Sequence, residues 1–460
     1  MELWNYKIIY IYNLQAFHKL NTLRKKEYEI SLAIMEINII STENIKPSSP
    51  TPDHLRSFKV YLLDQLAPHF YVPLVLFYSA DEFRSKNVDH IQICDQRKKS
   101  LSKTLTHFYP LAGSLKGNSF VECDDEGASY VEARVNIDLS EILQNPDMNI
   151  LTQFLPLNPY KVNDKGVPMT AFQANIFNCG SIGIGLCISH RIVDGATFAT
   201  FLNAWSEASK GATQTIIPSF NLASLFPPKD INVQVPHGVI SEEKTVTKRF
   251  IFDARSLGLL KAKVGLIGGH ANPSRVEAVT SLKWKTALSV TREKLRKTSI
   301  SSTLSHMVDL RGRMVQRLPE HCCGNLWQSA IASLTKEESN IDLHDLVDHI
   351  RKAIKKIDSD YIEKIQDALL EAFELRLEMV AKQEVEMYRF SSWIRFPFYN
   401  IDFGFGKPIW VCTTNVPIKN IVILMSTRSG DGIEAWVTLA EQVMAKFECH
   451  HELLEFVSST

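Results

Sequence analysis

A histidine, an aspartate and a glycine near the middle of the chain have the types and spacing for acid–base chemistry. His190 is followed four residues later by Asp194 and then by Gly195. Histidine suits a general base because its ordinary pKa of about 6.5 leaves the neutral form dominant at cytosolic pH. Asp194 could orient the imidazole as the acid of a catalytic triad does, or it could turn away and hold its loop by pairing with an arginine. The sequence leaves both roles open.

A second His-x-x-x-Asp pair shows how little this spacing means alone. His344 and Asp348 match it too, but His349 follows them in place of glycine. They fall off the apolar stripe of an expected amphipathic helix, so we interpret them as part of a solvated helix face. On spacing alone, a core histidine bound to a backbone carbonyl is an equally good interpretation of His190.

The residues before His190 favour the functional interpretation. Residues 170–177 and 181–189 are predicted to form two strands joined by a turn. In the second strand bulky apolar residues alternate with small ones, so one face is open to close approach by a backbone or a ligand. His190 continues the apolar phase, and its ring should point inward if the strand extends that far. Cys187 and Ser189 would lie on the opposite face, so neither is expected to form a nucleophile–base pair with His190.

Composition excludes several classes of function. The 460 residues include 51 Lys plus Arg and 51 Asp plus Glu, so there is no basic excess for binding nucleic acid. The 8 cysteines form no Cys-x-x-Cys pair and no zinc spacing, which predicts reduced thiols and no metal site. No apolar run is long enough to cross a bilayer. We therefore expect a cytoplasmic protein with no membrane or nucleic-acid partner. We also expect it to be a monomer.

Helical and strand patterns mix throughout both halves, which predicts an α/β fold. Residues 1–34 look foreign to the rest, and we expect an atypical extension or an upstream mis-start there, with an extra helix as the alternative. Residues 35–212 and 246–460 are expected to form two domains, because the proline-broken stretch 213–245 between them has the character of a crossover loop.

Several further elements are predicted from hydrophobic periodicity. Amphipathic helices are expected at residues 343–357 and 362–380, and a final helix at residues 434–447. The remaining predictions are strands at 74–78, 248–253, 409–412 and 421–425 and helices at 96–108, 198–208 and 276–290.

A glycine-rich segment follows His190 by about 210 residues. Asp402, Gly404 and Gly406 lie in the sequence Asp-Phe-Gly-Phe-Gly. No Gly-rich phosphate loop and no His-Arg-Asp loop accompany it, so it is not a kinase motif. On local grounds it is a tight structural turn.

The two motifs together resemble those of the plant BAHD acyltransferases. The resemblance rests on Ser-His-Arg-Ile-Val-Asp-Gly at 189–195 and Asp-Phe-Gly-Phe-Gly-Lys-Pro at 402–408. It extends from Met35 to the C-terminus through residues 108–113, residues 309–313 and Gly324-Asn325. Residues 391–399 look most like the branch that contains vinorine synthase, whose members acetylate alkaloids.

The resemblance implies two similarly sized domains of chloramphenicol-acetyltransferase-like topology with a channel between them. Acyl-CoA, expected to be acetyl-CoA, and a small-molecule alcohol would enter from opposite faces, with no bound cofactor. His190 would be the catalytic base, and Asp194 would pair with an arginine, for which Arg311 is the candidate. Asp402 would be mainly structural, although it is sometimes given a proton-transfer role. Phe405 stands where the family usually has Trp, and we expect the packing to survive without the indole donor.

The mechanism expected from this resemblance is direct transfer, in which His190 deprotonates the acceptor hydroxyl and no acyl-enzyme forms. Three alternatives remain. The chain could transfer a hydroxycinnamoyl or other acyl group to an alcohol or amine, or it could be an inactive binder of small molecules. A peptide-synthetase condensation domain is less compatible, because that family normally has a second histidine where Ser189 stands.

Overall fold

The computed structural model describes residues 35–85, 90–117, 119–161, 168–231, 241, 243–265, 272–295, 301–335, 338, 341–364 and 385–457. The expected extension at residues 1–34 lies outside the described residues, as does most of the helix expected at 362–380. Residues 232–240 and 242 of the expected crossover also lie outside them.

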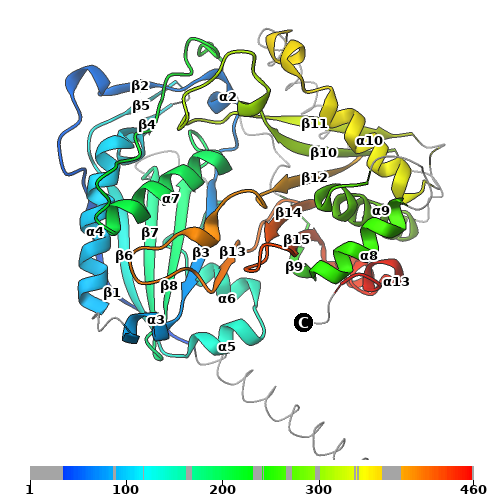
Figure 1. Ribbon diagram of the computed structural model, residues 1–460, viewed down its shortest axis with the longest axis horizontal. Helices are drawn as coiled ribbons and strands as arrows, with labels where there is room; N and C mark the ends of the chain where they lie inside the picture. Colours follow the sequence, from blue (N-terminus) through cyan, green and yellow to red (C-terminus); the bar gives the residue numbers. More distant parts are fainter. Residues whose placement is uncertain are drawn as a thin grey trace, which may run out of the picture.

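Two six-stranded mixed sheets, one in each half of the molecule, form the framework (Figure 1). The first has the order β1-β6-β7-β8-β3-β13. Its strands are β1 Ile37–Ile45, β3 Tyr71–Tyr78, β6 Ala128–Val135, β7 Thr170–Phe177, β8 Ile182–Ser189 and β13 Trp410–Cys412. The predicted hairpin of β7 and β8 is confirmed. Every residue of β3 and β8 is buried, which requires cover on both faces of the sheet.

Helices supply that cover in the first half. The long helices α4 and α7 pack together over one face, where the Trp205 indole of α7 donates to the Arg97 main-chain oxygen of α4 at 3.1 Å (Figure 1). The helices of this half are α2 Leu62–Gln65, α3 Ala80–Ser85, α4 His90–His107, α5 Leu139–Gln144, α6 Met148–Gln153 and α7 Gly195–Ser209. A small sheet contains β2 Ser57–Lys59, β4 Ser114–Lys116 and β5 Phe120–Glu122, and the 3-10 turns are η1 Asp53–Leu55 and η2 Tyr109–Ala112.

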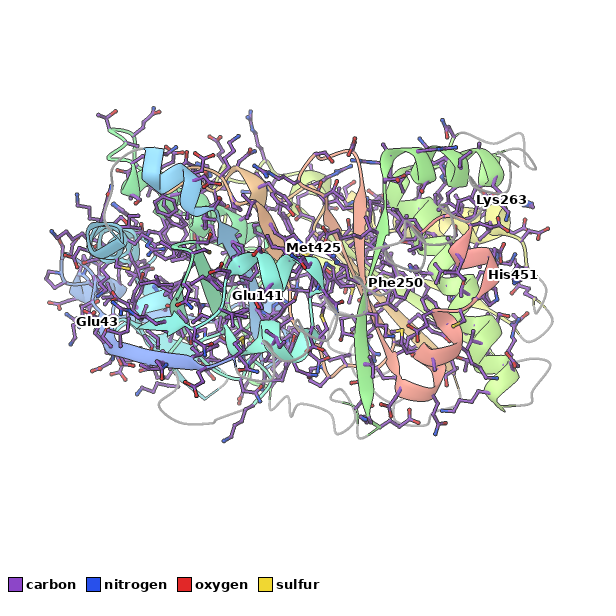
Figure 2. All side chains as sticks on the ribbon, turned by 90° about the horizontal axis from the view of Figure 1, so that it is seen from below. Glu43, Glu141, Phe250, Lys263, Met425 and His451 are labelled. Atoms are coloured by element: carbon purple, nitrogen blue, oxygen red, sulfur yellow. The ribbon has the colours of Figure 1, made fainter. Side chains whose placement is uncertain are left out.

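The second sheet has the order β11-β10-β12-β14-β15-β9. Its strands are β9 Thr245–Phe252, β10 Ser302–Asp309, β11 Trp327–Leu334, β12 Glu386–Ser392, β14 Ile421–Ser426 and β15 Ile433–Ala440. The accompanying helices are α8 Ala254–Gly265, α9 Arg275–Leu295, α10 Leu343–Lys355, α12 Glu441–Phe447 and α13 His451–Leu454, with 3-10 turns η3 Arg311–Arg313 and η4 Phe398–Asn400. Figure 2 shows Glu43 at one end of the molecule and Lys263 and His451 at the other, so the two halves lie end to end.

One strand crosses from the second half of the sequence into the first sheet. β13 pairs antiparallel with β3, with Trp410 opposite Phe77. The ring of Trp410 also stacks on Phe77 with centroids 5.5 Å apart. The segment after β12 therefore ties the second half to the first, a link that local sequence patterns did not predict.

The helix predicted at residues 434–447 is wrong over its first half. Residues Ile433–Ala440 form β15, and only Glu441–Phe447 are helical. β15 lies between β14 and β9 and is buried on both faces, so it lacks the polar–apolar alternation that marks a half-exposed strand. An apolar run of this kind cannot be distinguished from a buried helix by periodicity.

No helix in the described part of the chain is both long enough and apolar enough to cross a membrane.

Gly185 in β8 tests how tightly the first sheet is packed. A Cβ added there would lie 1.9 Å from the main-chain oxygen of Phe154, so Gly185→Ala must displace backbone. We expect it to lower the free energy of unfolding by about 2 to 3 kcal/mol. Gly258 in α8 is the control, because a Cβ there meets nothing within 4 Å. Gly258→Ala should raise stability by about 0.5 to 1 kcal/mol, and equal effects of the two variants in chemical denaturation would contradict this packing.

Candidate active site

His190 lies one residue beyond the end of β8, where the two halves meet. Its main-chain N–H donates to the Phe70 oxygen at 2.9 Å, which continues the strand pairing past Ser189. His190 is a partly buried residue whose imidazole lies edge-on to Phe70, with centroids 5.8 Å apart, and 6.2 Å from the indole of Trp327. Since Trp327 begins β11, the ring contacts aromatic groups from both halves.

The side-chain amide of Asn325 holds the imidazole. His190 Nδ1 lies 3.0 Å from Asn325 Oδ1, and the indole N–H of Trp327 donates to the same oxygen at 3.2 Å. On the other side, Asn325 Nδ2 donates to the main-chain oxygen of His190 and to Asp64 Oδ1, both at 2.8 Å. All four hydrogen-bonding positions of the amide are thus occupied.

These contacts determine which ring nitrogen of His190 carries the proton. An indole N–H only donates, so the amide atom facing Trp327 must be the oxygen. An oxygen in that place can only accept from His190 Nδ1, which must therefore be protonated. The neutral ring then has its lone pair on Nε2, the form a general base requires.

Burial keeps the imidazole neutral near pH 7. Desolvation lowers the pKa of His190 below its usual range, while the nearby main-chain groups, Asp194 and Asn325 oppose that shift in part. The ring is therefore ready to accept a proton without first losing one.

Asp194 contacts the arginine that the resemblance implied. Arg311 Nη1 lies 2.7 Å from Asp194 Oδ2, and Arg311 Nη2 lies 3.1 Å from Oδ1. The carboxylate also accepts from the main-chain N–H of Thr197 at 2.8 Å and of Leu326 at 3.0 Å. Burial alone would raise the pKa of Asp194, but Arg311 and these N–H groups lower it. The arrangement favours a supporting role over that of a triad acid.

Asp194 and Arg311 hold together the two segments that carry the site. Asp194 is the N-cap of α7, directly after the His190 turn. Arg311, in η3, also donates to the main-chain oxygens of Cys322 at 3.1 Å and Gly324 at 3.0 Å. The ion pair therefore connects the start of α7 to the loop that presents Asn325.

Gly195 gives an aromatic side chain access to the start of α7. A Cβ at this position would lie 2.3 Å from Phe396 Cε2. Phe396 belongs to the segment between β12 and η4, which comes from the other half. Glycine is needed here for close approach between the halves.

Asp402 forms a turn. Its Oδ1 accepts from the main-chain N–H groups of Gly404 and Gly406, both at 2.8 Å. The two glycines have φ of +103° and +118°, values that favour glycine. Phe405 is buried, with its ring 5.1 Å from Tyr78, so an aromatic side chain fills this position as expected. These contacts give Asp402 a structural task within its own loop.

Two residues at the site were not assigned a role from the sequence. Asn325 was named only as part of the Gly324-Asn325 pair in the family resemblance, and Asp64 was not named as a candidate site residue. A carboxylate in the apolar run Leu62-Leu63-Asp64 is an unusual feature, and this was the one local signal for it.

Neither the second His-x-x-x-Asp pair nor the cysteines form a site of their own. His344 is partly exposed on α10, with Nε2 3.1 Å from Asp345 Oδ1. None of the eight cysteines, all of which lie in the described ranges, forms a disulfide, and burial raises the pKa of Cys187, whose Sγ faces the Leu157 oxygen. Within the described ranges, no group of three or more His, Cys, Asp or Glu is arranged to hold a metal ion.

Removing Arg311 should destabilise the protein, because it leaves the Asp194 charge buried. We expect Arg311→Met to lower the free energy of unfolding at pH 7 by about 3 to 5 kcal/mol. The folded-state pKa of Asp194 is depressed, so its contribution is present above the unfolded pKa of about 3.9 and is lost as the pH falls through the folded value. The difference in the free energy of unfolding between wild type and Arg311→Met should therefore become smaller at acid pH.

Lys446→Met is the control, because its partner Glu293 is well exposed. It should change stability by no more than about 0.5 kcal/mol. An Arg311→Met protein as stable as this control would contradict a tight Asp194–Arg311 pair.

Comparison with known proteins gives the family. Residues 35–454 match the model of the Transferase family. Stemmadenine O-acetyltransferase of Catharanthus roseus is 39% identical over 417 residues, covering 89% of this chain and 96% of that protein. Vinorine synthase of Rauvolfia serpentina is 39% identical over 91% of this chain and 97% of its own. Limonoid 1-O-acetyltransferase of Citrus sinensis is 36% identical over 92% of this chain and 99% of its own.

The fold agrees with the sequence comparison. The crystal structure of vinorine synthase superposes with a TM-score of 0.80 and 38% identity, covering 92% of this chain and 99% of that one. The two-sheet α/β architecture is thus the one expected from the motifs. The chain belongs to the Transferase family, the plant BAHD acyltransferases, and is an acyltransferase.

Proposed function

We propose that this enzyme transfers the acetyl group of acetyl-CoA to a hydroxyl of a plant specialised metabolite such as an alkaloid, with His190 as general base. The observation that carries the proposal is the hydrogen bond between His190 Nδ1 and Asn325 Oδ1, which leaves the Nε2 lone pair for the substrate. Acetyl transfer is supported by the similarity to stemmadenine O-acetyltransferase and limonoid 1-O-acetyltransferase.

The reaction proceeds by direct transfer in a ternary complex. Nε2 of His190 accepts the hydroxyl proton as the acceptor oxygen attacks the thioester carbonyl. The resulting tetrahedral oxyanion collapses with cleavage of the carbon–sulfur bond. The imidazolium then returns its proton to the departing CoA thiolate, so the histidine ends each cycle neutral and no acyl-enzyme forms.

Aromatic residues around His190 support a flat, apolar acceptor. Phe70 and Trp327 flank the imidazole, and Tyr160 packs on Phe70 with centroids 5.5 Å apart. Such rings bind an apolar ring system through burial and edge-to-face contact. An alkaloid alcohol is our first choice, and the resemblance of residues 391–399 to the alkaloid-acetylating branch supports it.

The proposal includes the organisation of the chain. Residues 35–212 and 246–460 are proposed as the two domains, with residues 213–245 as the crossover. Acyl-CoA and the acceptor reach His190 from opposite ends of a channel between them, and the enzyme works as a cytoplasmic monomer.

His190→Ala tests the base assignment once an acceptor is found by screening acetyl-CoA against plant alcohols with mass detection of the ester. We expect kcat/KM to fall by about 10² to 10⁴, the usual contribution of a general base. Because the wild-type base has a lowered pKa, the loss of activity that comes from protonation of His190 itself should occur only below pH 6.5.

His344→Ala is the matched control, since His344 has the same His-x-x-x-Asp spacing on a partly exposed helix face. It should keep wild-type activity. A fully active His190→Ala enzyme would exclude His190 as the base. A protein that binds acetyl-CoA but releases no CoA with any alcohol or amine would point to the inactive binder instead.

A further inference from the structure

Behind Asn325 lies a second carboxylate that the mechanism so far does not use. Asp64, in α2, is 0% exposed. Its Oδ1 accepts two hydrogen bonds from Asn325, from the main-chain N–H at 2.7 Å and from Nδ2 at 2.8 Å. Its Oδ2 has no hydrogen-bond partner within the described part of the chain. Asp64, Asn325 and His190 thus form one continuous hydrogen-bonded chain.

A charged carboxylate is energetically unfavourable at this buried position. Taking its charge out of water costs free energy that two hydrogen bonds only partly offset. A neutral amide side chain could accept the same two bonds without that cost. An aspartate here therefore differs from an amide in its charge and not in the two hydrogen bonds that it accepts from Asn325.

The direction of the chain of hydrogen bonds indicates what the charge does. By accepting from Asn325 Nδ2, Asp64 opposes rotation of the amide, because a flipped Asn325 would place its oxygen against the carboxylate. The Asn325 oxygen is thereby held toward His190 Nδ1, where it stabilises the protonated ring. The negative charge behind the amide adds to that stabilisation.

We propose that Asp64 is a positioning residue for acyl transfer, which acts through Asn325 to hold the Nδ1-protonated tautomer of His190 and to stabilise the imidazolium formed when Nε2 takes the acceptor proton. This inference rests on the proposed role of His190 as base. It assigns to Asp64 the electrostatic part that the acid of a catalytic triad plays, with an amide inserted between the carboxylate and the ring.

The charges around Asp64 and Asp194 separate their roles. Asp194 is neutralised directly by Arg311. Around Asp64 the charged and titratable neighbours are Arg191, which attracts it, Asp194, which repels it, and the Tyr61 hydroxyl. Arg191 is itself in close contact with His69. Asp194 lies close enough to His190 to oppose the lowering of its pKa directly, whereas Asp64 is linked to the ring through the Asn325 amide.

The protonation state of Asp64 gives the inference a pH signature. Burial raises its pKa to about 7, against the lowering effect of Asn325 and Arg191. Asp64 is therefore mostly charged at pH 8 and mostly neutral at pH 6. Because its folded pKa is raised, it contributes stability below its unfolded pKa, and that contribution is lost as the pH rises through about 7. Removing the charge should not destabilise the protein at pH 8.

Asp64→Asn is the central variant, since asparagine can still accept from Asn325 but carries no charge. At pH 8 we expect kcat to fall about tenfold or more, equivalent to about one pKa unit of lost imidazolium stabilisation. KM values should stay within about twofold, and Tm should not fall. Wild-type kcat should show an acid limb at about pH 7, which Asp64→Asn should lack.

Glu434→Gln is the matched control, because Glu434 is also a buried carboxylate with a raised pKa but is bonded to Trp410 and paired with Arg249. It should keep the wild-type kcat and acid limb. In an Asn325→Ala background, Asp64→Asn should have no further effect on kcat, because the connection to His190 is already removed.

Wild-type kcat and pH profile in Asp64→Asn would overturn the inference. If that variant does not fold, a wild-type profile without an ionisation between pH 6 and 8 would overturn it equally. An inactive His190→Ala enzyme beside a fully active Asp64→Asn enzyme removes only the role of Asp64, whereas an active His190→Ala enzyme removes the proposed base itself.

Discussion

The site depends on the orientation of one buried side-chain amide. Asn325 accepts from His190 and Trp327 through its oxygen and donates to Asp64 and the His190 main chain through its nitrogen. These partners come from the residue after β8, from α2 and from the start of β11, so the four hydrogen bonds form together only when the two halves are assembled. Reversing the amide would break all four bonds at once, at a residue that is almost fully buried. The tautomer of His190 therefore depends on the assembly of the two halves around Asn325.

Two buried aspartates near His190 have pKa values shifted in opposite directions, because their hydrogen-bond and ion-pair partners differ. Asp194 receives a guanidinium and two main-chain N–H groups, which overcome desolvation and keep its pKa low. In the described part of the chain the Asp64 carboxylate accepts from Asn325 alone, and desolvation outweighs these bonds and the attraction of Arg191, so its pKa is raised. The first is a permanent charge that fixes a loop. The second has a pKa of about 7, so its charge changes with pH in the physiological range.

Local patterns predicted the parts of the fold that the chain determines within a few residues. The β7–β8 hairpin, α4 and α7 followed from periodicity, whereas β8 ends at Ser189, one residue short of His190. β15 was predicted as helix because a strand buried on both faces has no alternating pattern. The position of β13 in the first sheet could not be predicted, because it depends on a strand more than 300 residues earlier in the chain.

The same limit applies to the site. His190, Asp194 and Gly195 lie within six residues of one another and were found together, and Arg311 followed from the family resemblance. Asp64 and Asn325 are separated by 261 residues, and neither matters until tertiary contacts place the amide between carboxylate and imidazole. Their roles are properties of the assembled structure and leave only a weak trace in the sequence around each of them.

The most direct test of this account is the location of the proton on the neutral His190 ring. Nitrogen-15 NMR of histidine-labelled protein at pH 8, with the His190 signals assigned by their loss in the alanine variant, distinguishes the two tautomers. The account predicts a protonated Nδ1 and an unprotonated Nε2. A proton on Nε2 would mean that the Asn325 amide does not control the ring, and that His190 cannot act as the base in the way described.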